Sequence, residues 1–376
     1  MKLCRVQPPS SHFLALLLRL SDVWWFAYGS LVMKHAAALF SLLLVFSPLS
    51  VQRSLAISEK NYERDYESLV LPFLKSGDRF TFLSADGKYS LSGIKFIHSN
   101  AKGLILVVNG RAESWLKYGE LFYDLHHAGY SIISYDHRGQ GLSPRLIDGN
   151  PEIGYVDHFE NYVKDMDSLM KTLTPINHGT SDPSGPYLIA DSLGGAIAVR
   201  YLELHPAFFH AVVLTSPMLA INTTPYPSGV AHAMVSFFEA IGLGSFYAPG
   251  EHDYDPAATF DSNRVTSSIA RWWATQATWR EYPQAILGGA SNRWVKQSME
   301  ATGKIRRQLS AIKTRILLLQ AGRDQLVLNK PLQFASKRMQ DCRLVNFPDS
   351  KHEILFERDT IRSHALQEIV RFFNEK

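Results

Sequence analysis

The segment YLIADSLGG, residues 187–195, carries the strongest structural signal in this chain. The apolar run Tyr187 to Ala190 is followed by Asp191 and Ser192, and a helix start rich in small residues comes directly after them. A serine in this strand-turn-helix setting lies in a tight turn, and the residues two before and two after it must be small. They are Ala190 and Gly194. Taken alone, S-x-G more often marks a serine that caps a helix, so the surrounding sequence decides whether Ser192 is a nucleophile.

Short apolar runs on either side of this segment predict a sheet. Helix-period segments alternate with them, a pattern typical of a mostly parallel sheet with helices on both faces, and hence of the α/β class. Residues 79–84 and 89–97, joined by the turn residues 85–88, predict an antiparallel hairpin that brings the sheet to eight strands. The other expected strands are 103–109, 130–135, 187–191, 210–216, 315–320 and 342–347, and the helical segments include 114–127, 158–173, 193–204, 330–339 and 360–374.

Two residues at the ends of later strands complete a catalytic pattern with Ser192. A serine needs a base to accept its proton and an acid to orient that base, in the chain order serine, acid, histidine. Asp324 follows the run 315–320, and His352 follows the run 342–347. The carboxyl ends of parallel strands meet at one edge of a sheet, so we predict a triad of Ser192, Asp324 and His352 there. Taken alone, an aspartate in the position of Asp324 is also typical of a helix cap. A histidine in the position of His352 is also typical of the protein surface.

The segment VVNGR, residues 107–111, predicts the place where an oxyanion is stabilised. Acyl transfer places negative charge on an oxygen that needs two fixed hydrogen-bond donors. The N–H of Leu193, next to the nucleophile, is one expected donor, and the N–H of Arg111 is the other. Gly110 lets the backbone come close. Read alone, the segment is also consistent with a simple strand-ending turn.

The loop DHRGQGLS, residues 136–143, follows another expected strand, and we interpret it as a structural loop that shapes the pocket wall. The sequence contains no Walker loop, no G-x-G-x-x-G and no H-E-x-x-H motif. Only Cys4 and Cys342 are present, so we expect no structural disulfide and no cysteine-based metal site. The predicted chemistry needs no cofactor and no metal.

About 94 residues, 220–313, separate two expected strands, and a structureless loop of that length is uncommon. We therefore expect an inserted helical lid. Its many aromatic residues have two interpretations: they form the insertion's own small core, or some of them line an acyl-binding surface that faces the main domain. The aromatics in question are Phe237, Phe238, Phe246, Tyr247, Trp272, Trp273, Trp279, Tyr282 and Trp294.

The first 56 residues are typical of a targeting segment. Residues 36–51 form an apolar run between Lys34 and a small-residue cleavage pattern, and Met33 lies where such a signal begins. We expect a signal peptide or a membrane-proximal anchor at 1–56 and a single catalytic domain at 57–376. This indicates the cell envelope, by export or inner-membrane association; a cytoplasmic location is the alternative.

Charge argues against a nucleic-acid partner. The formal charge of the chain is +4, and residues 1–56 account for all of it with five basic residues against Asp22. The remaining body is formally neutral, whereas nucleic-acid binding needs an excess of clustered basic side chains. Nothing in the sequence indicates an oligomeric state.

With these residues in place, the chain resembles the α/β-hydrolases, and within them the branch of monoglyceride lipases and bacterial lysophospholipases, whose domain is similar to that of serine aminopeptidases. The resemblance spans about residues 75–374. Asn109 and Ala190 stand where many members have His and Gly. Four segments carry the resemblance: NGRAESWLKYGELFYDLHHAGYSIISYDHRGQGLS at 109–143, LIADSLGGAIAVRYLELHP at 188–206, LGGASNRWVKQSM at 287–299 and KHEILFERDTIRSHALQEIVRFF at 351–373.

The resemblance implies the α/β-hydrolase fold with an inserted lid, and a serine carboxylester hydrolase acting on single-chain lipids. The expected substrate is a lysophospholipid or a monoacylglycerol, met at a membrane surface. A lysophospholipase that forms an acyl-serine intermediate is the main hypothesis. A monoacylglycerol lipase or general carboxylesterase, or a serine aminopeptidase of the same fold, is the alternative. A binding protein on an inactive scaffold is a third reading, which the presence of all three triad residues disfavours.

Overall fold

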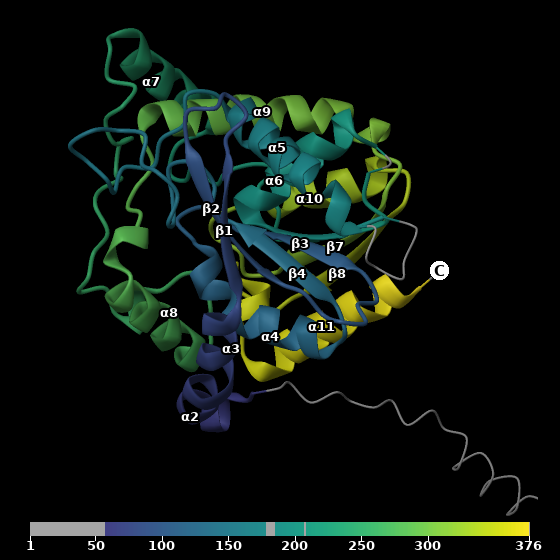
Figure 1. Cartoon of the computed structure of the whole chain (residues 1–376). Helices are drawn as coiled ribbons and strands as arrows, with labels where there is room; N and C mark the ends of the chain where they lie inside the picture. Colours follow the sequence, from purple (N-terminus) through teal and green to yellow (C-terminus); the bar gives the residue numbers. More distant parts are fainter. Residues whose placement is uncertain (1–56, 178–184, 207, 376) are drawn as a thin grey trace, which may run out of the picture. The chain divides into compact units, whose positions relative to one another are not determined.

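The computed structural model describes residues 57–177, 185–206 and 208–375 (Figure 1). The predicted targeting segment, 1–56, lies outside these residues. In the described part of the chain, no helix is both long enough and apolar enough to cross a bilayer.

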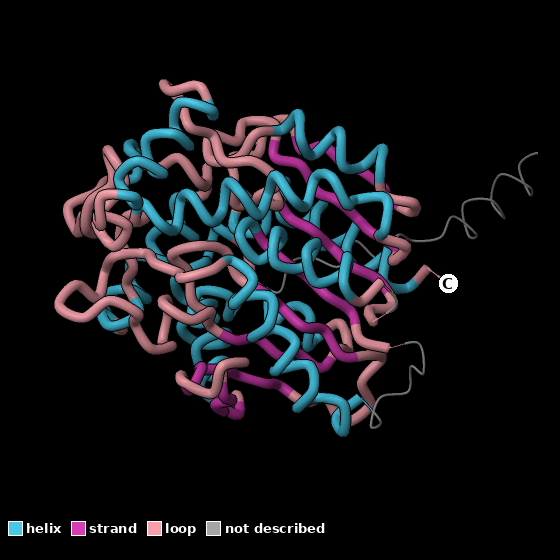
Figure 2. The backbone as a smooth tube through the Cα atoms, turned by 90° about the horizontal axis from the view of Figure 1, so that it is seen from above, coloured by secondary structure: helices cyan, strands magenta, loops and turns pink. Residues whose placement is uncertain are grey.

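The described residues contain one eight-stranded sheet in the order β1-β2-β4-β3-β5-β6-β7-β8 (Figures 1 and 2). The hairpin pairs β1 with β2 and β2 with β4 in antiparallel fashion, and all other neighbours are parallel. This confirms the predicted fold class. The strands are β1 Asp78–Leu83, β2 Ser90–Phe96, β3 Leu104–Val108, β4 Ser131–Tyr135, β5 Tyr187–Asp191, β6 Ala211–Thr215, β7 Arg315–Ala321 and β8 Cys342–Phe347.

Helices cover both faces of the sheet. One core cluster packs α5, α6, α9 and α10 on one face, and a second packs α4 and α11 on the other (Figure 1). Every residue of the central strands β3, β4, β5 and β6 is buried, which explains their continuous apolar sequences. The helices are α2 Tyr62–Asp65, α3 Leu71–Ser76, α4 Gly119–His127, α5 Phe159–Asn177, α6 Ser192–Leu204, α7 Ser228–Ala240, α8 Ile269–Glu281, α9 Asn292–Gln308, α10 Asn329–Arg338 and α11 Asp359–Asn374. Short helical turns are η1 Glu59–Asn61, η2 Tyr66–Val70, η3 Trp115–Tyr118, η4 Phe260–Ser262, η5 Pro283–Ala285, η6 Leu309–Ala311 and η7 Ile354–Phe356.

The interval 220–313 contains two kinds of structure. Its last helix, α9, packs against the main core through Trp294 and Ile305 and returns the chain from β6 to the parallel strand β7. The earlier part, with α7 and α8, extends away from the sheet beyond the ends of the strands (Figure 1). Only this earlier part, which contains α7 and α8, lies where it can cover the ends of the strands. We call it the covering region.

The first described residues form a short helical segment that anchors α8. Ile57 is buried, and the Tyr62 hydroxyl donates to a carboxylate oxygen of Glu120 at 2.9 Å. The Glu120 carboxylate also accepts from the guanidinium of Arg271 on α8, at 2.9 and 3.0 Å. The Glu59 carboxylate accepts from the Ser268 hydroxyl, which caps α8, at 2.6 Å. The sequence patterns gave no prediction for this segment.

Candidate active site

Ser192 lies at the turn between β5 and α6, with a φ of 47°. This left-handed conformation is rare for a residue with a side chain and is typical of a nucleophile elbow. Gly194 makes the turn possible, because a Cβ there would lie 2.4 Å from the carbonyl oxygen of Val108. The small residue expected two positions after the serine therefore has a specific steric reason: α6 begins directly against the end of β3.

Three side chains predicted from the sequence lie in a hydrogen-bonded row. His352 Nε2 lies 2.9 Å from the Ser192 hydroxyl, and His352 Nδ1 lies 2.6 Å from a carboxylate oxygen of Asp324. The other oxygen of Asp324 accepts the N–H groups of Leu326 and Val327, at 2.8 and 3.0 Å. These bonds fix the Asp324 carboxylate, which in turn fixes the imidazole ring. The arrangement has the geometry that proton transfer from serine to histidine requires.

The charges around His352 favour its protonated form. Burial by itself would lower the pKa of His352, but the hydrogen bond and charge of Asp324, together with Asp191 and Glu353, outweigh burial and raise it. An imidazolium that forms during serine attack is therefore stabilised in place.

The two expected oxyanion donors come from two segments that pack against each other at Gly194. Leu193 follows the nucleophile in the first turn of α6, and Arg111 lies in the loop after β3. Among the hydrogen bonds of the described residues, neither N–H has an acceptor. Two N–H groups without an acceptor are what an oxyanion formed at Ser192 would need.

The side chain of Arg111 reaches from this loop to residues 287–294, which lead from the covering region into α9. Its guanidinium donates to the carbonyl oxygen of Gly288 at 2.7 Å and lies over the Trp294 ring, 5.0 Å from the ring centre. The backbone of Arg111 thus belongs to the candidate site, and its side chain belongs to the wall formed by residues 287–294.

A buried charge cluster that the sequence analysis did not identify lies beside the triad. The Lys117 ammonium contacts carboxylate oxygens of Glu113 at 2.5 Å and Glu353 at 2.6 Å. Asp191 accepts from the Thr215 hydroxyl, and burial together with the charge of Glu113 raises the pKa of Asp191 to about 7. The spacing of Glu113 and Lys117, four residues apart, was a visible signal, but it does not reveal that the pair is buried.

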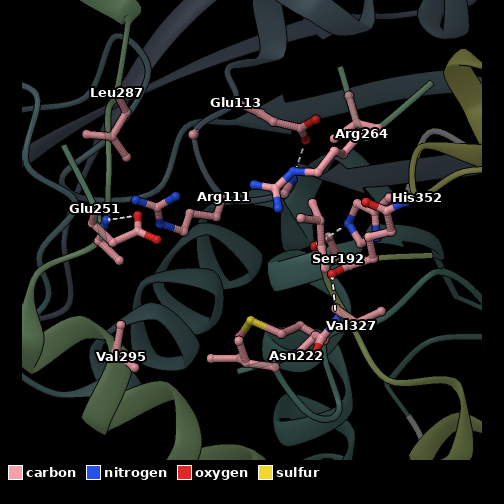
Figure 3. A pocket seen from close by; sticks show the side chains of 18 of the residues that line it. Arg111, Glu113, Ser192, Asn222, Glu251, Arg264, Leu287, Val295, Val327 and His352 are labelled. Carbon is pink, nitrogen blue, oxygen red and sulfur yellow. Dashed lines mark hydrogen bonds between the residues drawn. The ribbon is translucent and has the colours of Figure 1, made fainter. Parts of the chain in front are cut away.

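The candidate triad opens into a cavity of about 1180 Å³ (Figure 3). Gly110, Arg111, Ser192 and His352 line it together with the covering region. Of the aromatics in the interval 220–313, Trp272, Trp279 and Trp294 are buried and line the cavity. Phe237, Phe246 and Trp273 are exposed instead, so these aromatics do not form one small core of their own.

Comparisons with known proteins agree with this geometry. The family model described as serine aminopeptidase, S33 matches residues 99–359. A probable lysophospholipase L2 from Haemophilus influenzae is 33% identical over 277 residues, which cover 73% of this chain and 85% of that protein. The monoglyceride lipase of Mus musculus is 25% identical over 293 residues, covering 76% of this chain and 87% of that protein.

A solved structure supports the fold independently. The crystal structure of Paleococcus ferrophilus monoacylglycerol lipase superposes with a TM-score of 0.59 at 22% identity, covering 75% of this chain and 98% of that one. With the family match spanning most of the chain, and with the parallel sheet and the serine elbow in place, this chain belongs to the serine aminopeptidase S33 family of α/β-hydrolases.

Proposed function

We propose that this chain is a serine carboxylic ester hydrolase, a lysophospholipase that releases a fatty acid from single-chain phospholipids. One observation carries the proposal: the hydrogen-bonded row of Asp324, His352 and Ser192 opens into a large, partly apolar cavity. The relative with 33% identity, named a probable lysophospholipase L2, supports the substrate class.

The proposed mechanism has two steps. His352 takes the Ser192 proton as the serine oxygen attacks the ester carbonyl, and Asp324 stabilises the imidazolium. The N–H groups of Leu193 and Arg111 hold the oxyanion of the tetrahedral intermediate. His352 then protonates the departing alcohol, which leaves an acyl-serine that water hydrolyses by the reverse sequence of proton transfers.

The cavity suits an acyl chain next to a charged headgroup. Its volume exceeds the roughly 300–1,000 Å³ of common small-ligand pockets. Apolar side chains line much of it, among them Met218, Ile221, Val235 and Leu287. Arg264 also lines it, and Figure 3 shows this side chain extending into the cavity. Within the described residues the Arg264 guanidinium has no ion-pair partner, so it is available to a phosphate.

The outer face of α7 supports action at a membrane surface. Val230 and Phe237 on this helix, and Ile241 directly after its last residue, lie in line along one side and are 51%, 60% and 54% exposed. The neighbouring face of the helix, with Ala231, Met234 and Val235, lines the cavity. A helix with two adjacent apolar faces suits an entrance where one face lies against a lipid layer and the other receives the acyl chain.

A monoacylglycerol is the second candidate substrate. The mouse monoglyceride lipase matches this chain at 25% identity over 293 residues, and a neutral glycerol headgroup needs no cationic partner. The two substrates therefore differ in whether Arg264 contributes to binding.

Labelling of the full chain with a fluorophosphonate, followed by mass spectrometry of the labelled peptide, tests the proposal. The same sample is assayed on lysophosphatidylcholine, on a monoacylglycerol and on aminoacyl anilides. We expect label on Ser192, fatty-acid release from the lysolipid, and loss of both in Ser192→Ala with an unchanged melting temperature. Label without release from the lysolipid would reassign the substrate, and wild-type turnover in Ser192→Ala would overturn the mechanism.

A further inference from the structure

The loop 136–143, between β4 and α5, contacts the backbone of the candidate oxyanion loop. The cavity lining, as far as the structure describes it, contains none of these residues. The expectation that the loop shapes the pocket wall was therefore wrong. Its side chains bond the backbone of residues 109–113 instead.

The peptide group between Asn109 and Gly110 is held at both ends. The ring nitrogen Nε2 of His137 lies 3.1 Å from the Asn109 carbonyl oxygen, and the Gly110 N–H donates to a Glu113 carboxylate oxygen at 2.7 Å. Burial lowers the pKa of His137 to about 4, so the ring is neutral at pH 7. Because a carbonyl oxygen can only accept, the ring proton lies on Nε2.

The next peptide group, between Gly110 and Arg111, is held at its carbonyl end alone. The side-chain amide of Gln140 donates to the Gly110 carbonyl oxygen at 2.7 Å and to the Glu113 carbonyl oxygen at 3.1 Å. A trans peptide is planar, with its C=O and N–H pointing in opposite directions. Gln140 therefore fixes the direction in which the Arg111 N–H points, and among the described residues that N–H has no acceptor.

We propose that Gln140 is a positioning residue for the oxyanion donor Arg111. By holding the Gly110 carbonyl, it keeps the N–H of the same peptide group aimed at the reacting oxygen. A hydrogen bond accepted by the carbonyl also polarises the peptide and makes its N–H a stronger donor. The proposal rests on the proposed serine hydrolase mechanism and adds to it a residue that does not line the cavity.

A purely structural role of Gln140 would lead to a different experimental result. If the Gln140 amide only stabilised the loop, removing that amide would lower the melting temperature of the protein. It would not selectively weaken binding of the transition state. Ser143 provides the matched comparison in the same loop. Its hydroxyl donates to the Asp136 carbonyl oxygen at 2.7 Å and accepts the Ser92 N–H at 3.0 Å, with no bond to residues 109–111.

The experiment compares Gln140→Met, which keeps the length and removes both donors, with Gln140→Asn, which draws the amide back by one carbon. A soluble p-nitrophenyl ester reports turnover. We expect kcat to fall by about tenfold in both variants with KM within about twofold of wild type, since only the transition state is affected. Ser143→Ala should lower the melting temperature and leave kcat unchanged.

A second measurement tests how tightly the enzyme binds an oxyanion, separately from the other parts of the substrate. A trifluoromethyl ketone with an acyl tail forms a tetrahedral adduct with serine, so its inhibition constant should rise by the same factor as kcat/KM falls. A non-hydrolysable ether analogue of the lysolipid should bind the Gln140 variants as it binds wild type. Unchanged ketone affinity in Gln140→Met, or equal losses for ketone and ether, would overturn the proposal. A wild-type protein that hydrolyses no ester would instead remove the proposed function.

Discussion

The hydroxyl of Ser216 donates a 2.7 Å hydrogen bond to the backbone carbonyl oxygen of His352, 136 positions further along the chain. Ser216 follows β6 directly and has a φ of 41°, a left-handed conformation that is costly for a residue other than glycine. Its own N–H donates to the Leu319 carbonyl oxygen at 2.9 Å, which holds this conformation. The end of β6 therefore supports the loop that carries the candidate base.

Ser216→Ala keeps the backbone conformation and removes this support. We expect kcat to fall by roughly three- to tenfold with KM unchanged, because the imidazole is less well placed for proton transfer. Ser298→Ala is the control, since Ser298 is a buried hydroxyl on α9 for which the described residues provide no hydrogen-bond partner. Equal kcat values for both variants and wild type would show that Ser216 does not position His352.

The pH dependence of activity follows from the environment of His352. Serine attack needs the neutral imidazole, and the pKa of His352 is raised above its usual 6.5, so kcat/KM should rise with pH through a value above 6.5. Asp324→Asn removes the main cause of the raised pKa, and kcat should fall by about 10⁴-fold. The acidic limb of the remaining activity should move to lower pH. A limb that stays in place would assign the titration to another group, such as Asp191.

Arg264→Gln separates the two candidate substrates. If Arg264 binds a phosphate, kcat/KM for lysophosphatidylcholine should fall by about tenfold, and that for a monoacylglycerol should change by less than about twofold. Arg307→Gln is the matched control, because Arg307 is an exposed arginine on α9 that is not among the residues lining the cavity. Parallel losses on both substrates would mean that Arg264 supports the fold or the covering region rather than the binding of the headgroup.

The outer face of α7 can be tested without touching the cavity. Phe237→Ser combined with Ile241→Ser should lower the hydrolysis of lysolipid held in phospholipid vesicles by roughly three- to tenfold. Hydrolysis of a soluble p-nitrophenyl ester should not change. Phe334 on α10 is a comparably exposed aromatic residue, with 47% of its surface accessible to solvent. Phe334→Ser should change neither rate. A lower rate on the soluble ester for the α7 variant would show instead that the substitutions disturb the covering region.

Gly194→Ala tests the steric basis of the elbow. The added Cβ would lie 2.4 Å from the Val108 carbonyl oxygen and 2.7 Å from that of Asn109, so α6 must shift away from the oxyanion loop. We expect a loss of at least about 100-fold in kcat. Gly303→Ala, on α9, introduces a Cβ whose nearest neighbour is the end of the Arg307 side chain at 3.9 Å. That variant should keep full activity and be slightly more stable, since alanine favours helix.

Local patterns were sufficient to predict the sheet and to single out the residues of the candidate triad. Continuous apolar runs identified β3 to β7 because parallel strands in the middle of the sheet are covered on both faces. The edge strand β8 is only partly buried and was identified from a shorter, mixed run. Ser192, Asp324 and His352 each follow such a run, and strand ends at one edge come together regardless of their separation in sequence. The tight turn at Ser192 could be predicted because the two residues that must be small, Ala190 and Gly194, lie within two positions of the serine.

The parts that escaped prediction depend on contacts between distant segments. Glu353 next to His352 has no local feature that pairs it with Lys117, and Gln140 stands in a loop whose glycines suggested only a turn. The aromatics of the covering region were equally ambiguous, because a buried tryptophan in a core and one in a cavity wall have the same sequence signature. In each case the partner is set by the packing of the whole domain.

Arg111 is shared between the site and the region that covers it: its N–H is an expected oxyanion donor, and its guanidinium is bonded to Gly288 and stacked on Trp294. A shift of residues 287–294 is therefore transmitted through one side chain to the donor. If Arg111 donates to the oxyanion as proposed, changes in that wall that suit a new acyl chain should also change the rate of the chemical step. Substrate range and turnover would then be linked through one residue.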